Sequence, residues 1–347
     1  MTPPEFRKPN CVHFIMRTSK KQPYSPQKNH IRRCDSLEKE GFWRYNRDVI
    51  LFQGDYMNGI NAKQPPSERA MSKFQIVLIT IFLMVLLICA GILFLDWYDG
   101  YKSEKEKEQL ASEMQSAAQQ ITAPMGENDI LPAFRSLYEQ NKDTVGWIKI
   151  DGTPIDYVVV QTDNNNDYLR TAYDGSYNRN GTIFLDYQSQ FNPKGKNIVI
   201  YGHNMKTQAM FSTLDEYKTV EYYQEHPIVE FDTLYEKSKY KIFAVVLMDA
   251  SPDETGSGDE FKLYSQFSND DSFMNYIDAI RAHSLLDIDV DVQKDDLIIS
   301  LVTCSYDIED GRYAIFARQI RDDESEEVDT STAKLNEDVI MPSEYTG

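Results

Sequence analysis

The chain has 347 residues, of which 36 are basic and 55 acidic, and its net charge is −19. Hydrophobic residues make up 41% and charged residues 26%, which predicts a mostly globular protein rather than a disordered one. The negative charge argues against nucleic-acid binding, and the four cysteines lack the spacing of a zinc ribbon or a disulfide scaffold.

Positive and negative charges are separated along the chain. Residues 1–73 hold 14 basic and 7 acidic residues, a net charge of +7, and show little periodicity. Residues 74–95 carry no charge, and residues 96–347 hold 22 basic and 48 acidic residues, a net charge of −26. The pattern predicts a basic, weakly ordered tail before the uncharged stretch and an acidic domain after it.

The uncharged stretch 74–95 predicts a transmembrane helix. Its 22 residues are apolar except for Gln75 and Thr80, and about 20 apolar residues suffice to cross a bilayer. Because basic residues precede the span and acidic sequence follows it, we expect the N-terminus in the cytoplasm and the remainder outside the cell. Residues 1–73 are then a cytoplasmic tail. Alternatively, Met71 is the true initiator, since Met-Ser-Lys followed by an apolar run is typical of the start of a membrane-anchored protein.

Two helices are expected after the span. Residues 96–126 predict a stalk or linker whose helix covers 98–122, with Leu110 and Met114 on one face. A second helix is expected near 130–142.

From Trp147 onward the apolar pattern becomes that of strands. Residues 147–150 and 155–160 predict a hairpin around an Asp-Gly turn. Further strands are expected at 182–186, 197–201, 228–232, 239–248, 297–303 and 313–320, with one helix at 270–283. Short strands at this spacing predict a closed β-barrel or a sandwich within a domain at 127–321. Residues 322–347 hold nine acidic residues and one lysine, which predicts a solvated, disordered tail.

Cys304 is the candidate nucleophile. It ends an apolar strand, and it is the one cysteine expected in the exported domain, so it is either a buried apolar residue or a reactive thiol. A thiol needs a basic partner, and His203 follows a strand and a glycine, a common way to present a side chain at a rim. His226 is expected on the surface and His283 as a helix cap.

Arg312 lies eight residues beyond Cys304 and opens the next strand. If the two strands pair antiparallel, Arg312 lies close to Cys304 and can bind substrate or stabilise an oxyanion. Arg318 is six residues further along and is expected to be structural. The sequence has no HExxH motif, no Cys/His cluster and no P-loop, so no metal or cofactor is expected.

Together these features resemble the sortases, membrane-anchored cysteine transpeptidases of Gram-positive bacteria. The motifs that carry the resemblance are Tyr201-Gly202-His203-Asn204-Met205, Leu301-Val302-Thr303-Cys304 and Arg312. Segments at 141–148, 161–164, 181–186 and 304–306 resemble class B members in particular. Val302 departs from the pattern, because many members carry a small polar residue there.

The resemblance implies a closed barrel of about eight strands with N-terminal helices and a helix before the cysteine strand. It implies that Cys304 attacks a C-terminal sorting motif after Thr, that His203 acts as acid and base, and that Arg312 positions the substrate. Asn165, Leu169, Tyr201 and Thr303 are then expected to bind the substrate, although Asn165 could be a turn residue and Tyr201 a rim aromatic.

The implied partners are exported proteins with a sorting signal, an amine of the cell wall, and the lipid bilayer. Three alternatives stay open: a pilin-polymerising sortase that uses a protein lysine, a membrane-anchored cysteine protease, and an inactive binding domain.

Overall fold

The computed structural model describes residues 72–118, 129–250, 261–342 and 345. The chain divides into two units, Met1–Val85 and Leu86–Gly347. The predicted basic tail and the alternative start at Met71 lie outside the described residues, apart from Ser72 and Lys73.

Helix α1 (Lys73–Ala118) is continuous through the predicted span and the predicted stalk. Within the described residues it is the one helix that is long and apolar enough to cross a membrane by length and composition. Its apolar side chains are exposed, including Phe74 at 70% and Leu87 at 72%. Such a surface is unfavourable in water and favourable in lipid, so α1 is a candidate transmembrane span.

The second unit contains a closed barrel of eight strands in the order β1-β2-β3-β4-β8-β9-β6-β5, closed by pairing of β1 with β5. The strands are β1 (Thr144–Lys149), β2 (Asp156–Val160), β3 (Phe184–Leu185), β4 (Asn197–Tyr201), β5 (Ile228–Thr233), β6 (Lys239–Asp249), β8 (Ile298–Cys304) and β9 (Gly311–Gln319). The barrel is mixed, because β2–β3 and β4–β8 are parallel and the other pairs antiparallel. The predictions of a closed barrel and of the β1–β2 hairpin are confirmed.

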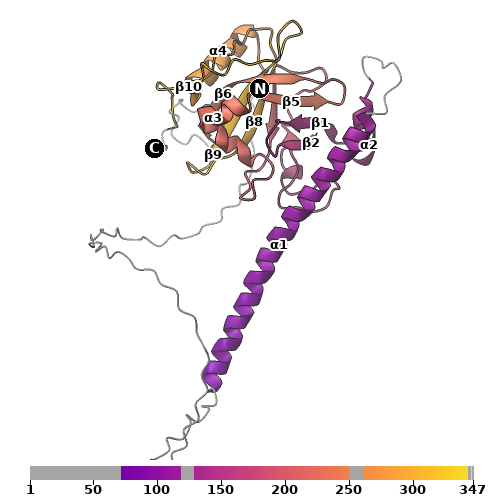
Figure 1. The fold of residues 1–347 in the computed structure, drawn as a ribbon, viewed down its shortest axis with the longest axis vertical. Helices are drawn as coiled ribbons and strands as arrows, with labels where there is room; N and C mark the ends of the chain where they lie inside the picture. Colours follow the sequence, from indigo (N-terminus) through magenta and orange to yellow (C-terminus); the bar gives the residue numbers. More distant parts are fainter. Residues whose placement is uncertain (1–71, 119–128, 251–260, 343–344, 346–347) are drawn as a thin grey trace, which may run out of the picture. The chain divides into compact units, whose positions relative to one another are not determined.

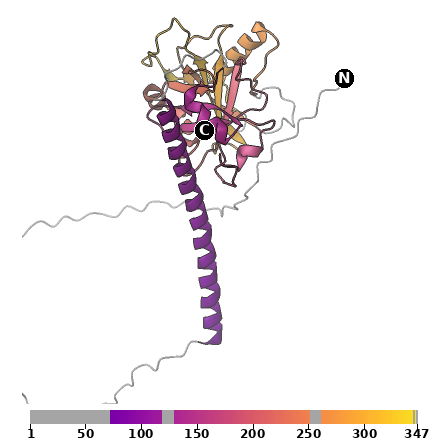
Figure 2. The ribbon, with the colours of Figure 1, turned by 90° about the vertical axis from the view of Figure 1, so that its right-hand side faces the viewer.

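Among the described residues, three α-helices accompany the barrel: α2 (Pro132–Gln140), α3 (Val220–Glu225) and α4 (Asp270–Ala282). Helix α2 has Pro132 at its first turn, where a missing N–H costs nothing. Helix α4 begins with a capping box of Asn269 and Ser272 and packs outside the barrel against β6 (Figures 1 and 2). Two 3-10 helices, Asp167–Leu169 and Ser212–Lys218, lie in the connections after β2 and β4.

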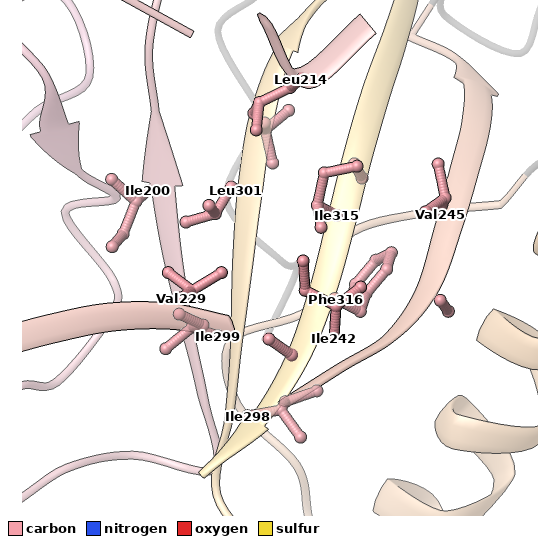
Figure 3. Close-up of a cluster of buried hydrophobic side chains, with 14 of the residues drawn as sticks. Ile200, Leu214, Val229, Ile242, Val245, Ile298, Ile299, Leu301, Ile315 and Phe316 are labelled. Atoms are coloured by element: carbon pink, nitrogen blue, oxygen red, sulfur yellow. The ribbon is translucent and has the colours of Figure 1, made fainter. Parts of the chain in front are cut away.

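The barrel interior is filled by branched aliphatic side chains. Ile200, Leu301 and Ile315 point inward from β4, β8 and β9, and each is fully buried (Figure 3). A second apolar cluster lies outside the barrel, where Phe134 and Leu137 of α2 pack with Trp147 and with Leu110 of α1. The strands therefore have two apolar faces, which explains their nearly continuous burial.

The C-terminal segment differs from the predicted disordered tail. Its residues β10 (Lys334–Leu335) pair antiparallel with β7 (Leu286–Asp287), and the Ile340 N–H donates to the Ala282 carbonyl at 2.9 Å. Glu324 forms ion pairs with Arg318 and Lys241. The acidic residues that suggested a solvated tail include one that neutralises buried cations of the barrel, a role that composition does not reveal.

Candidate active site

Two parallel strands deliver the histidine and the cysteine to one edge of the barrel. In the β4–β8 pair Tyr201 lies opposite Val302, and both chains run in the same direction. His203 and Cys304 each follow that pair by two residues: His203 lies just beyond the end of β4, and Cys304 is the last residue of β8. The side chains of both are half-buried, which leaves part of each exposed to a substrate.

Arg312 reaches the same edge from the other side of β8. Strands β8 and β9 are antiparallel, and their register places Arg312 directly opposite Cys304. The Arg312 guanidinium donates from Nη1 to the carbonyls of Asp310 at 3.1 Å and Gly311 at 2.8 Å. These bonds orient the cation at the strand end, and the antiparallel pairing agrees with the expectation from the sequence.

The ring of His203 is held by a main-chain carbonyl. Its Nε2 lies 2.8 Å from the carbonyl oxygen of Leu169. A carbonyl only accepts hydrogen bonds, so Nε2 carries the hydrogen and Nδ1 carries the lone pair of the neutral ring. Leu169 thereby sets the tautomer, and Nδ1 is the nitrogen that can exchange a proton.

Burial lowers the pKa of His203 below its ordinary value. The hydrogen bond to Leu169 opposes this shift, and the positive charges of Arg170 and Arg312 add to it. The imidazole is therefore neutral at neutral pH, in the state that accepts a proton.

Tyr201 and Asn165 meet at a buried carboxylate, Asp186. Asn165 donates from Nδ2 to Asp186 Oδ2 at 2.7 Å and accepts from the Tyr187 N–H at 3.0 Å. Burial raises the pKa of Tyr201, and the charge of Asp186 raises it further, so the phenol is neutral. Asn165 and Tyr201 are half-buried, and Asn165 holds the connection after β2 against the end of β3.

Thr303 differs from the expectation of a substrate contact. Its side chain is 2% exposed, and its hydroxyl has no hydrogen-bond partner among the described residues. Successive residues of a strand point to opposite faces, so Thr303 points away from the face that carries Cys304. Its position is one of packing rather than of substrate contact.

The other predicted roles concern residues away from this edge. Arg318 is 1% exposed and pairs with Glu324, as expected for a structural residue. His283 follows α4 and bonds through Nδ1 to the Ala279 carbonyl. Among the described residues no group of three or more His, Cys, Asp or Glu could hold a metal ion.

Comparison with known proteins identifies the family. A model of the sortase domain matches residues 148–320. Sortase B of Staphylococcus aureus is 30% identical over 234 residues, which cover 67% of this chain and 91% of that protein. Sortase B of Listeria monocytogenes is 30% identical over 237 residues, which cover 67% of this chain and 93% of that protein.

The chain belongs to the sortase family.

A Staphylococcus aureus sortase B–substrate complex has a TM-score of 0.55 and 29% identity to this sortase, covering 65% of this chain and 98% of that one. The family consists of cysteine transpeptidases, and the relatives are class B members. The eight-stranded barrel agrees with the class B structures.

Sequence reasoning missed three residues of this sortase that contact the site. Asp186 joins Asn165 and Tyr201, and Asn204 and Tyr306 bond the segments of His203 and Cys304 to one another. Asn204 and Tyr306 stood inside the motifs that carried the family resemblance, but their types gave no chemical reason to select them. Their contacts join segments about 100 residues apart, which one sequence does not reveal.

Proposed function

We propose that this sortase cleaves a C-terminal sorting motif of exported proteins after Thr and transfers the acyl group to an amine of the cell wall. Cys304 is the nucleophile, His203 the acid and base, and Arg312 the residue that stabilises charge on the substrate. The observation that supports this proposal is the shared edge of the barrel, where His203 follows β4, Cys304 ends the parallel strand β8, and Arg312 lies opposite Cys304.

The reaction has two steps. The Cys304 sulfur attacks the Thr carbonyl carbon, and the thiol proton passes to Nδ1 of His203 and then to the leaving amine nitrogen as the peptide bond breaks. The product is a thioester on Cys304. An incoming amine then attacks the thioester carbonyl, His203 accepts the proton of that amine, and the thiol is restored as a new amide forms.

Arg312 stabilises the oxygen that becomes negative in both tetrahedral intermediates. Its guanidinium is already held by the carbonyls of Asp310 and Gly311, so little reorganisation is needed during the reaction. Asn165, Leu169 and Tyr201 are the residues we assign to the substrate groove. All three are half-buried, and the hydrogen bond from His203 to the Leu169 carbonyl supports the assignment of Leu169.

The membrane arrangement is part of the proposal. The apolar part of α1 (residues 74–95) crosses the bilayer, residues 1–73 lie in the cytoplasm, and the domain at 127–321 faces the outside. The charge asymmetry of +7 before the span and −26 after it supports this orientation. At the outer face the thiol meets exported proteins and wall precursors, whose amines are the acceptors.

The test uses the full chain in detergent micelles with peptides that carry NPxTx, SPxTG and LPxTG cores, plus a diamine or an oligoglycine. We expect cleavage after Thr and an amine adduct, seen by mass spectrometry, that Cys304→Ala abolishes. Cys89→Ala is the matched control, because it removes another free thiol and is expected to keep activity.

Three outcomes would contradict the proposal. Cleavage at another bond, with a rate and products unchanged by added amine, would indicate a protease. Transfer only to a lysine of a pilin-like protein would indicate pilus assembly. A Cys304 thiol that resists alkylation, together with no reaction, would indicate a binding domain.

A further inference from the structure

The main-chain ladder between β4 and β8 ends before the histidine and the cysteine. Its last register pair is Tyr201 with Val302, and the Gly202 N–H then donates to the Val302 carbonyl at 3.1 Å. His203 and Cys304 both lie beyond this point. The sheet therefore brings the two segments to the same edge but does not by itself set the separation of their side chains.

Two side-chain hydrogen bonds join the segments beyond the ladder. Asn204 donates from Nδ2 to the Cys304 carbonyl at 2.8 Å, and Tyr306 donates from its hydroxyl to the Asn204 carbonyl at 3.0 Å. Each segment thus supplies one side-chain donor and one main-chain acceptor. We call this pair of bonds the Asn204–Tyr306 clasp.

The two segments joined by the clasp are each anchored elsewhere. The His203 carbonyl accepts from the Phe211 N–H at 3.0 Å, and Leu169 holds the ring. Cys304 pairs with Arg312 across β8 and β9. Because each segment is also held by these other contacts, a change in the clasp alters the distance between the imidazole and the thiol.

Tyr306 makes little other contribution to the fold. Its side chain is 70% exposed, so it contributes little to the packed interior. Burial of the phenol raises the pKa of Tyr306, and the charge of Cys304 raises it further. The hydroxyl therefore keeps its proton and donates at neutral pH.

We propose that Asn204 and Tyr306 are positioning residues that hold His203 and Cys304 at the separation the transfer reaction requires. The proposal rests on the proposed function, since it assigns the proton exchange to these two side chains. It adds two residues whose role is to align the reacting pair rather than to touch the substrate.

The test compares Tyr306→Phe, which removes one hydroxyl, with Tyr177→Phe, a matched control whose side chain is 67% exposed. A hydrogen bond contributes about 1 kcal/mol, so we expect kcat of Tyr306→Phe to fall about five- to tenfold. KM and the melting temperature should stay unchanged, and Tyr177→Phe should match the wild type. Asn204→Ala should lower kcat as well. The fold decrease in kcat of the double variant should be smaller than the product of the two single decreases, because both bonds fix the same distance between His203 and Cys304.

A second readout does not need a peptide substrate. Site-resolved mass spectrometry follows iodoacetamide alkylation of Cys304 in the full chain across pH. Because proton sharing between thiol and imidazole depends on their separation, we expect Tyr306→Phe to shift the pH midpoint of alkylation, and Tyr177→Phe not to shift it.

The proposal is overturned if Tyr306→Phe matches the wild type in kcat and in alkylation midpoint. It is also overturned if Tyr306→Phe raises KM and leaves kcat unchanged. The same holds if the free energy of unfolding falls by as much as the activation free energy of the reaction rises. Failure of the proposed function looks different, because the wild type itself would then transfer no peptide while the alkylation midpoint would still report on the clasp.

Discussion

Replacing Glu324 by Gln tests whether the C-terminal segment stabilises the barrel through buried charge. Glu324 accepts from Arg318 Nη2 at 2.9 Å and from Lys241 Nζ at 2.7 Å, both through Oε1, and its Oε2 pairs with Arg318 Nη1. The side chain of Arg318 is 1% exposed and that of Lys241 is 8% exposed. Two buried cations therefore share this carboxylate.

The loss of stability in Glu324→Gln depends on the contacts that Arg318 keeps after the substitution. Breaking a buried ion pair costs about 3–5 kcal/mol because the other charge stays buried. Arg318 keeps weaker contacts with Asp291 at 3.6 Å and Asp296 at 4.0 Å, so we expect about 2–3 kcal/mol. In a domain of this size that corresponds to a fall of about 4–12 °C in melting temperature.

The contribution of Glu324 to stability is expected to decrease as the pH falls. The hydrogen bond from Arg318 lowers the pKa of Glu324 well below its ordinary value of 4.5. A carboxylate whose pKa is lowered by folding contributes stability above the pKa of the unfolded state, and this contribution is lost as the pH falls. The difference between wild type and Glu324→Gln should be constant at neutral pH and should shrink below pH 4.5.

Thermal unfolding of the full chain in detergent, followed by circular dichroism at pH 7 and in acid, measures this difference. The matched control is Glu326→Gln, two residues on, whose carboxylate is 66% exposed and lies 2.6 Å from Lys239. Exposed pairs contribute about 0–1 kcal/mol, so the control should melt close to the wild type. Equal shifts in the two variants, or a Glu324→Gln effect that does not shrink in acid, would refute the reasoning.

Two further predictions concern the edge of the barrel. Arg312→Lys keeps the charge but loses the planar fork, so we expect kcat/KM for peptide transfer to fall at least about tenfold while Cys304 still alkylates; full activity would contradict an oxyanion role. Thr303→Val replaces a buried hydroxyl that has no partner among the described residues, so the melting temperature should stay equal or rise and kcat/KM should change less than about twofold; a large rise in KM would restore Thr303 as a substrate contact.

The sequence alone was sufficient to predict the strands of the barrel and to select the candidate reacting residues. Short apolar runs identified β1, β2 and β4, because a strand with two apolar faces is apolar along most of its length and the pattern is local. The uncharged stretch 74–95 identified the apolar part of α1 for the same reason. Cys304 and Arg312 could be paired in advance because a short connection between consecutive strands favours antiparallel neighbours.

Other features depend on contacts between distant segments. The parallel β4–β8 pair joins residues about 100 positions apart, and it brings the segments of His203 and Cys304 to the same edge of the barrel. The carbonyl of Leu169 selects the tautomer of His203 from a connection 34 residues away.

What the sequence by itself determined is therefore the strands of the barrel, the candidate span and the residue types that can perform thiol chemistry, because each follows from a local apolar pattern or from a local motif. Only the tertiary structure decided how those residues are held: the clasp of Asn204 and Tyr306, the packing position of Thr303, and the docking of the segment around Glu324. Hydrogen bonds and buried ion pairs act over about 3 Å in space, whatever the separation of their partners along the chain.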